Sequence, residues 1–507
     1  MNKKYGIIID QLSLSTEKVL IEDASFSITN GQKIALIGRN GSGKTCLLEL
    51  INSLISNKKI PDYIKIKGKI SFLPDTRIAY IKQKFILDTL NQYEHLSRIN
   101  KEIDILKFNN RDMQNILTGF DLDEHILNKE VQDMSQGERM KIIIAKTLFS
   151  NPNFIMLDEP TNGLDYESKF FLSNYIQNTE SSILLVSHDR DFIDNTVDRI
   201  LEIDEHTRKI ITFGGNYSFY KEQKDNIYTN ELKDYYDKNK KLKKLKKEVN
   251  RLREKAFSEK SKRKARILSE KIEKKDIYMP KLPKKSHFVL NVNNTNKKNL
   301  FLECKNCKFN YNKRKIFDAI DIKVYANERI LLIGKNGSGK STLLNIFNKK
   351  LKFNTGKLYV NKEIISQYIP QNLEIEDKNI NLLDHINSET KEIPDSEIKT
   401  IIGSLLFKDA SKTKLIELSV GELKKIELIK LFSNYSNFIM IDELTNHLDL
   451  YTIESLENSL NTYPGGFIIA THDTRLIRNI DITKILYIDN YRIEIYNKND
   501  LKNFIHE

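Results

Sequence analysis

The chain has 507 residues, of which 39% are hydrophobic and 30% are charged, and its formal net charge is +13. A chain of this length is too long for one hydrophobic core, so it predicts two or three domains. No apolar run approaches the ~18 to 20 residues of a membrane span, and the first ten residues lack a signal-peptide cleavage pattern, so we expect a soluble cytoplasmic protein with no membrane partner.

The cysteine content is that of a protein from a reducing compartment. The chain has three cysteines, too few for a disulfide framework. Cys304 and Cys307 form a CxxC pair, but a zinc site needs further ligands, and the only other cysteine is Cys46. We therefore expect packed thiols in a strand that enters the second domain.

Four segments of the first half recur in the same order in the second half. The recurring pairs are GRNGSGKT (Gly38–Thr45) and GKNGSGKS (Gly334–Ser341), MSQGE and LSVGE, FIMLDEPTNGLD and FIMIDELTNHLD, and VSHD and ATHD. Three matched pairs are each 284 residues apart: Ser135 and Ser419, Glu159 and Glu443, His188 and His472. The two halves are therefore in register, which predicts a duplicated domain.

Each half has the hydrophobic pattern of alternating strands and helices. Short apolar runs of buried-strand type cover 33–37, 155–157 and 183–186 in the first half, and 329–333, 439–441 and 467–470 in the second. The first run of each half ends at a glycine-rich turn, after which helix-forming residues follow. This order predicts a mainly parallel α/β domain in both halves.

Between the halves lies a basic segment with a helical pattern. Residues 221–285 contain 24 Lys and Arg against 11 Asp and Glu, so the rest of the chain is formally neutral. One narrow apolar stripe predicts a helix over Tyr217–Arg253, about 50 Å long, a turn near 255–262 and a second helix that carries Ile267, Leu268 and Ile272. The chain is thus expected to comprise a first α/β domain (1–215), a helical hairpin linker (216–298) and a second α/β domain (299–507).

The glycine-rich turns match the phosphate-binding loop, and both stand between a strand and a helix. Such a loop turns its backbone amides toward a β-phosphate, and the helix N-terminus adds its dipole. Lys44 or Lys340 is expected to contact the β and γ oxygens, and Thr45 or Ser341 to bind Mg²⁺. The loop residues are Gly38, Asn40, Gly41, Ser42, Gly43, Lys44 and Thr45, and Gly334, Asn336, Gly337, Ser338, Gly339, Lys340 and Ser341.

An acidic pair ends the strand that follows in each half. Asp158 and Asp442 are placed to bind the metal, while Glu159 and Glu443 are placed to orient or deprotonate an attacking water. An acidic pair at a strand end would alone be ordinary surface decoration. With a phosphate loop upstream, it predicts phosphoryl transfer.

The order of these motifs in both halves resembles the ABC ATPase family. The resemblance implies two ATP sites formed head to tail within a monomer, in which Ser135 and Gly137 close over nucleotide at Lys340, and Ser419 and Gly421 close over nucleotide at Lys44. It also implies further site residues: Gln83 and Gln371 as glutamines that contact Mg²⁺, His188 and His472 as switch histidines, and Tyr311 as the aromatic that stacks on adenine. The first half offers only Leu14 and Ser15 where such an aromatic is expected.

Twin cassettes around a basic hairpin are similar to the ABC-F proteins. This resemblance implies binding at the ribosomal tRNA exit site, with the linker directed toward the peptidyl-transferase centre, 23S rRNA and P-site tRNA. A basic hairpin also suits RNA phosphate without base readout, although a charged helix can simply be solvated. The residues expected to contact RNA are Arg251, Arg253, Lys255, Phe257, Lys260, Lys262, Arg263, Lys264 and Arg266.

Departures from the repeat leave more than one function open. Gly163 stands where the second copy has His447, and Leu444 stands where the first has Pro160, so the two ATP sites can be unequal. Only 51 residues separate Gln83 from Ser135, which leaves little room for an inserted arm and favours a ribosome-protection factor that displaces antibiotics. The alternatives are a general translation factor, a DNA-repair ATPase and the energising subunit of a transporter.

Overall fold

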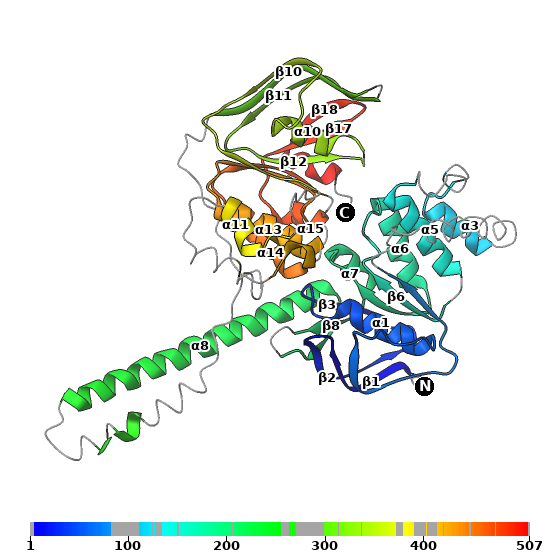
Figure 1. Ribbon diagram of the computed structural model, residues 1–507, viewed down its shortest axis with the longest axis vertical. Coiled ribbons are helices and arrows are strands. Elements are labelled where there is room, and N and C mark those ends of the chain that lie inside the picture. Colours follow the sequence, from blue (N-terminus) through cyan, green and yellow to red (C-terminus); the bar gives the residue numbers. More distant parts are fainter. Residues whose placement is uncertain are drawn as a thin grey trace. The chain divides into compact units, whose positions relative to one another are not determined.

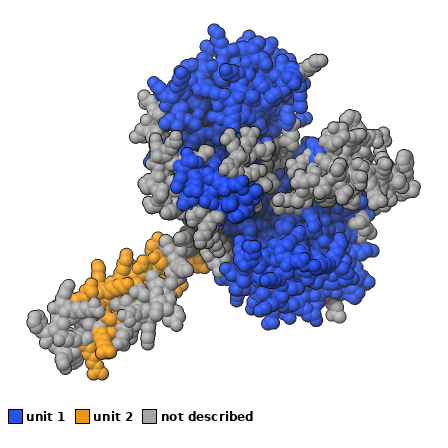
Figure 2. Space-filling model, viewed as in Figure 1, with its two compact units in different colours: residues 1–216, 287–507 blue, residues 217–286 orange. Residues whose placement is uncertain are grey.

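The protein is described here by a computed structural model that divides into two compact units. One unit comprises Met1–Asn216 and His287–Glu507, and the other comprises Tyr217–Ser286 (Figure 2). The described residues are 5–82, 111–123, 126, 134–149, 152–204, 207–254, 263–264, 266–269, 299–312, 314–335, 337–371, 379–389, 402, 413–418, 420–445, 448–471 and 473–504.

The first α/β domain is built on a six-stranded sheet in the order β5-β6-β7-β3-β8-β9 (Figure 1). Its strands are β3 (Lys33–Gly38), β5 (Ile78–Ile81), β6 (Phe154–Asp158), β7 (Ser182–Val186), β8 (Arg199–Ile203) and β9 (Ile210–Gly214). Its helices are α1 (Lys44–Ile55), α3 (Arg111–Gly119), α5 (Gln136–Phe149), α6 (Tyr166–Asn178) and α7 (Arg190–Thr196). All pairs are parallel except β8 with β9, which confirms the expected parallel architecture.

The second α/β domain repeats this sheet in the order β14-β15-β16-β12-β17-β18. Its strands are β12 (Arg329–Gly334), β14 (Ser366–Ile369), β15 (Phe438–Asp442), β16 (Gly466–Ala470), β17 (Lys484–Asp489) and β18 (Arg492–Asn497). Its helices are α10 (Lys340–Phe347), α11 (Leu382–Glu389), α13 (Val420–Ser433), α14 (Leu450–Thr462) and α15 (Thr474–Asn479), with 3₁₀ turns η2 (Leu415–Glu417) and η3 (Lys498–Asn503). Strands β15 and β16 are buried along their whole length, because helices can cover both faces of a parallel sheet.

Each domain also carries a three-stranded antiparallel sheet that the sequence analysis does not predict. The orders are β2-β1-β4 and β11-β10-β13. The strands are β1 (Tyr5–Ser15), β2 (Val19–Thr29), β4 (Lys65–Phe72), β10 (Leu300–Tyr311), β11 (Arg314–Tyr325) and β13 (Thr355–Val360). Cys304 and Cys307 lie buried in β10 among Phe301 and Phe309, which confirms that they are packed thiols.

The unit of residues 217–286 begins with the long helix α8 (Tyr217–Glu254) (Figure 1). This helix agrees with the predicted one to within a residue at its end. Leu242 and Val249 form a small buried cluster, against which Leu245 and Leu268 pack, and residues 266–269 are helical. The returning segment therefore contacts α8 along the predicted apolar stripe, whereas the predicted turn (255–262) and Ile272 lie outside the described residues.

A membrane span is not found in the described ranges. None of the helices there combines the length and the apolarity that crossing a bilayer requires.

Candidate nucleotide sites

The first phosphate loop lies between β3 and α1, as its sequence predicts. Gly43 caps α1 with φ 101°, a backbone conformation that glycine adopts without strain. A Cβ on Gly38 would lie 2.8 Å from Ser42 Oγ, so this position also requires glycine. Lys44 Nζ donates to the carbonyl oxygens of Gly38 at 2.8 Å and Arg39 at 3.0 Å, and burial lowers its pKa. The lysine is therefore held inside the loop where a phosphate would meet it.

The second loop, between β12 and α10, repeats this geometry. Gly339 has φ 107°, and Lys340 Nζ donates to Gly334 O at 2.8 Å and Lys335 O at 3.3 Å. Ser338 Oγ, like Ser42 Oγ in the first loop, is buried without a hydrogen-bond partner among the described residues. Asn336 lies outside these residues. Both loops thus offer buried polar groups that a phosphate would satisfy.

A hydroxyl and a carboxylate meet behind each loop. Thr45 Oγ1 donates to Asp158 Oδ2 at 2.9 Å, and burial raises the pKa of Asp158 to about 6, against the effect of this hydrogen bond. Burial also raises the pKa of Asp442, whereas the Ser341 hydroxyl lowers it. Among the described residues, no group forms a hydrogen bond of standard geometry with either carboxylate oxygen of Asp442. These oxygen ligands fit Mg²⁺, which would supply charge neutralisation to the phosphates.

Glu159 and His188 lie together at the ends of β6 and β7. His188 Nε2 is 3.2 Å from Glu159 Oε1, and the His188 amide donates to Glu159 Oε2 at 3.3 Å. Glu159 has φ 54°, an uncommon conformation for a residue other than glycine, and its amide donates to Val186 O at 2.8 Å. Burial, then the neighbouring Asp158, raises the pKa of Glu159 to about 8. The position of the Glu159 carboxyl group and its raised pKa are both as expected of a general base.

Glu443 is placed in the same way in the second domain. It has φ 47°, and its amide donates to Ala470 O at 2.8 Å. Gln371 Nε2 donates to Glu443 Oε2 at 2.7 Å, so the predicted glutamine and acid are in contact. Lys424 Nζ donates to Glu443 O at 3.2 Å, and burial lowers the pKa of this lysine to about 8. Gln83 and His472 lie outside the described residues.

Residues of the second domain reach the first phosphate loop. The Asn40 amide donates to Asp449 Oδ2 at 3.4 Å, and Lys425 Nζ is 2.8 Å from the same oxygen. Tyr451 hydrogen-bonds to Glu202, and the Arg39 guanidinium lies 5.4 Å from the centre of the Tyr451 ring. The sequence analysis did not predict that Lys425 and Tyr451 belong to this site. Asp449 is the last residue of the repeated TNxLD motif, which was the available signal.

A family model described as ABC transporter matches residues 21–162 and 317–446, which is more than half of the chain. The chain belongs to the ABC transporter family. A second model with the same description matches residues 203–288, which run from the end of β8 through β9 and α8. The matched ranges contain both phosphate loops and the acidic pairs that follow β6 and β15, and the protein is an ATPase.

Several ATP-binding proteins match this ABC protein over nearly its whole length. ATP-binding protein Uup of Buchnera aphidicola (subsp. Schizaphis graminum) is 30% identical over 91% of this chain and 77% of its own. The ABC transporter ATP-binding protein ARB1 of Saccharomyces cerevisiae is 27% identical over 91% and 80%. The energy-dependent translational throttle protein EttA of Escherichia coli O6:H1 is 25% identical over 95% and 91%.

Solved structures share the fold of this ABC protein. An archaeal ribosome recycling factor, aABCE1, superposes with a TM-score of 0.63 at 15% identity, covering 95% of this chain and 90% of that one. A structure titled RNase-L Inhibitor also reaches 0.63 at 15% identity, over 97% and 92%. At this identity the likeness concerns the twin-cassette architecture alone.

The ABC signature segment opens α5 in the first cassette. The Ser135 amide donates to Glu138 Oε2 at 2.7 Å and the Glu138 amide to Ser135 Oγ at 3.2 Å, which caps the helix. A Cβ on Gly137 would lie 2.4 Å from Gly163 O, so glycine is required for the close approach of these two loops. In the second cassette Gly421 is buried, and Ser419 lies outside the described residues.

The remaining expected contact residues are Tyr311, for adenine, and the basic residues of the hairpin, for RNA. Tyr311 ends β10 with 46% of its surface exposed and pairs in register with Arg314, whose Nη2 is 3.6 Å from the Cβ position of Gly337. An aromatic ring is therefore exposed next to the second phosphate loop. Among the expected RNA-binding residues, Arg251, Arg263, Lys264 and Arg266 are exposed, Arg253 lies on α8, and Lys255, Phe257, Lys260 and Lys262 lie outside the described residues.

Proposed function

We propose that this chain is an ATPase that acts on the ribosome and uses its basic hairpin to bind ribosomal RNA. The observation that carries the proposal is helix α8, whose seven lysines between Lys238 and Lys247 are all exposed. Such a surface attracts RNA phosphate by counterion release and needs no base readout. The name of EttA, a translational throttle protein that matches along 95% of the chain, supports a partner in translation.

ATP binding and hydrolysis are proposed to control how long the protein stays bound to the ribosome. Mg²⁺ would be held by Thr45 and Asp158 in the first site and by Ser341 and Asp442 in the second. Changing both Glu159 and Glu443 to Gln should leave ATP bound and unhydrolysed. We expect this double variant to co-sediment with ribosomes in ATP at least about tenfold more than the parent protein, an effect that corresponds to ~1.4 kcal/mol. Co-sedimentation no better than that of the parent protein would contradict the proposal.

The contribution of the hairpin can be separated from that of the cassettes. Lys240, Lys243 and Lys247 are exposed on α8, whereas Lys65, Lys67 and Lys69 are exposed on the edge strand β4. Changing the first three to Gln should weaken ribosome binding and flatten its dependence on salt concentration, because fewer counterions are released. The same three changes on β4 are the matched control, and an equal loss from both sets would argue against a specific role for the hairpin.

The site of action is proposed to be the tRNA exit site, with the tip of the hairpin near 23S rRNA and P-site tRNA. Within this function, displacement of antibiotics is favoured by the short segment between Gln83 and Ser135. Action as a general translation factor is favoured by the name of EttA. Expression in a sensitive host, tested against lincosamides, pleuromutilins, streptogramin A compounds, phenicols and macrolides, decides between them. Unchanged susceptibility to every class would assign the protein to translation in general.

A further inference from the structure

Two loops at matching positions of the sequence repeat follow β7 and β16 in the two cassettes. Each ends in an aspartate that caps the next helix: Asp189 Oδ1 accepts from the Phe192 amide at 3.0 Å, and Asp473 Oδ1 accepts from the Leu476 amide at 2.9 Å. In the sequence, these aspartates directly follow the positions of the two switch histidines. A shift of either aspartate would therefore be felt at the neighbouring hydrolytic site.

The two aspartates differ in the origin of their counter-charge. Asp189 Oδ2 lies 2.8 Å from Nζ of Lys169, which stands on α6 of the same cassette. Although burial alone would raise the pKa of Asp189, Lys169 brings it below its usual value. The residue 284 positions after Lys169 is Ile453, a buried apolar side chain on α14. In the first cassette, the amine of Lys169 neutralises Asp189. The second cassette has an apolar residue in place of this lysine, so no amine at this position can neutralise Asp473.

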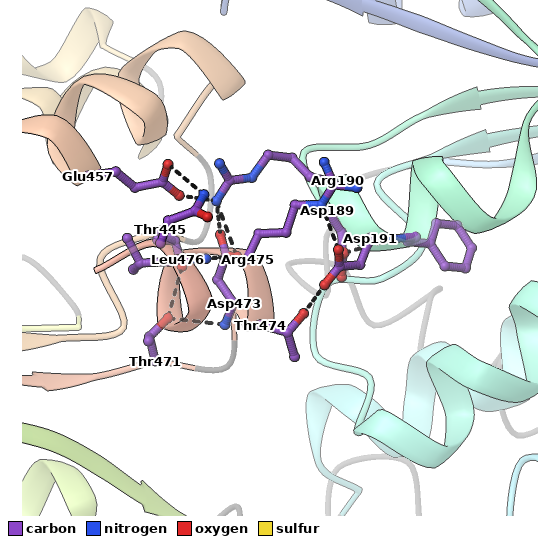
Figure 3. Close-up of polar contacts among 12 residues, drawn as sticks. Asp189, Arg190, Asp191, Thr445, Glu457, Thr471, Asp473, Thr474, Arg475 and Leu476 are labelled. Atoms are coloured by element: carbon purple, nitrogen blue, oxygen red, sulfur yellow. Dashed lines mark hydrogen bonds and ion pairs between the residues drawn. The ribbon is translucent and has the colours of Figure 1, made fainter. Parts of the chain in front are cut away.

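Arg190 of the first cassette lies at the corresponding place beside Asp473. Its Nη2 is 3.4 Å from Asp473 Oδ1 and also contacts Glu457 of α14 (Figure 3). Only 3% of the Arg190 side chain and 17% of that of Asp473 are exposed. The guanidinium thus reaches across from α7 to the N-terminus of α15 and pairs with two carboxylates in a water-poor environment.

A second cross-cassette pair has the opposite polarity. Arg475 Nε lies 2.6 Å from Asp191 Oδ1 (Figure 3). The same arginine also contacts Asp194. Arg475 and Asp191 occupy matching positions in the repeat, 284 residues apart. Because the charges are reversed between the copies, each loop complements the other.

The end of β16 and the loop that follows it contact the segment that carries Glu443 in the same cassette. Glu443 donates its amide to Ala470 O at 2.8 Å, and the hydroxyls of Thr445 and Thr471 are 3.4 Å apart. The amide of Asp473 in turn donates to Thr471 Oγ1 at 3.1 Å. A chain of contacts therefore leads from Arg190 through Asp473 to the strand end that carries Glu443.

We propose that Arg190 of the first cassette is a positioning residue for ATP hydrolysis by the second cassette, which it serves by neutralising Asp473. Without the guanidinium, a largely buried carboxylate would lose a counter-charge and would either take up a proton or turn toward water. Either response moves the loop that follows β16. Hydrolysis at the Glu443 site then depends on a side chain that this cassette lacks.

Single-turnover ATP hydrolysis in two backgrounds tests this assignment. In the Glu159→Gln protein the remaining hydrolysis reports the Glu443 site, and in the Glu443→Gln protein it reports the Glu159 site. We expect Arg190→Met to slow the first at least about tenfold and to change the second less than about twofold. Lys169→Met is the matched control and should show the reverse preference, because Lys169 serves Asp189. Equal effects of Arg190→Met in both backgrounds would overturn the proposal.

A rescue experiment distinguishes the proposed positioning role of Arg190 from a general contribution to the contact between the cassettes. Asp473→Asn removes the charge that Arg190 neutralises, while asparagine still caps a helix. The Arg190→Met/Asp473→Asn protein should therefore recover most of the rate at the Glu443 site, and Arg190→Lys should retain part of it. Thermal unfolding and ATP affinity show whether each variant folds. If the variants fold but Asp473→Asn does not restore the rate, then only the contact of Arg190 with Glu457 matters, and the proposal is refuted. If Arg190→Met does not fold, Arg190→Lys with and without Asp473→Asn provides the same comparison.

Discussion

Lys425 Nζ lies 2.8 Å from Asp449 Oδ2, and the Asp449 side chain is completely inaccessible to solvent. In the matching pair of the first cassette, Lys141 Nζ lies at a similar distance of 2.7 Å from Asp165 Oδ2, but 41% of the aspartate side chain is exposed. Asp449 also accepts from the amide of Asn40 in the first phosphate loop. The repeat thus places one chemical pair in two environments, which makes the cassettes unequal.

The first prediction compares this pair with its counterpart. Asp449→Asn should lower the free energy of unfolding by about 3 kcal/mol, because it leaves the buried Lys425 without its counter-charge. Asparagine retains the helix cap, so the change concerns charge alone. Asp165→Asn should cost clearly less, since water already screens that carboxylate. Denaturant midpoints of the two variants provide the measurement, and equal shifts would contradict the inequality.

The second prediction concerns the close approach of the signature glycine to the loop after β6. Gly137→Ala should reduce ATP hydrolysis at least about tenfold, because its Cβ would lie 2.4 Å from Gly163 O and push the loops apart. Gly214→Ala is the control, because nothing lies within 4 Å of its Cβ position. Steady-state ATPase rates distinguish the two, and comparable rates for both variants would mean that the loops can separate without consequence.

The third prediction is a pH dependence of the Lys169–Asp189 pair. The folded protein lowers the pKa of Asp189 and raises that of Lys169. The pair therefore stabilises the folded state between the unfolded pKa values of about 3.9 and about 10.4, and this contribution is lost as pH falls through the folded pKa of Asp189 or rises through that of Lys169. The stability difference between the parent protein and Lys169→Met should shrink below about pH 4, as denaturation at pH 3 to 7 would show. A difference independent of pH would indicate that Lys169 acts through packing.

The fourth prediction concerns the apolar stripe of α8. Leu242→Ala should destabilise the hairpin by about 2 kcal/mol, because Leu242 and Val249 form a buried cluster against which Leu268 of the returning segment packs. Hydrogen exchange of the α8 amides should accelerate, while ATP hydrolysis without ribosomes stays unchanged. Lys243→Ala, at an exposed neighbouring position, provides the control. Unaltered exchange in Leu242→Ala would show that the hairpin seam does not stabilise the helix.

The parts of the fold that could be predicted are those with strong local patterns. The strand before Lys44, the glycine turn and the helix after it follow one another within a few residues, and glycine spacing and apolar runs specify them. Helix α8 was predictable because its apolar stripe continues for many turns. The antiparallel sheets were not predicted, because their strands lack the continuous apolar runs of buried parallel strands. In β2, for example, buried side chains alternate with more exposed ones from Ala24 to Thr29.

Among the site residues, the sequence predicted which groups carry the chemistry, and the structure added their contacts. Thr45 meets Asp158, His188 meets Glu159 and Gln371 meets Glu443. The contacts of Gln83, Ser419 and His472 remain predictions, since these residues lie outside the described ones. The assignment of RNA contacts to the hairpin tip likewise remains a prediction.

The sequence by itself determined that the chain has two ATP-binding cassettes around a basic helix, because the phosphate loops, the acidic strand ends and the helical period are local properties that recur 284 residues apart. Only the tertiary structure decided which charges neutralise one another. Asp189 finds Lys169 within its own cassette, whereas Asp473 finds Arg190, 283 residues away in the other. The physical reason is that a buried carboxylate takes its counter-charge from whichever cation packing brings within reach, and no local pattern specifies that distance.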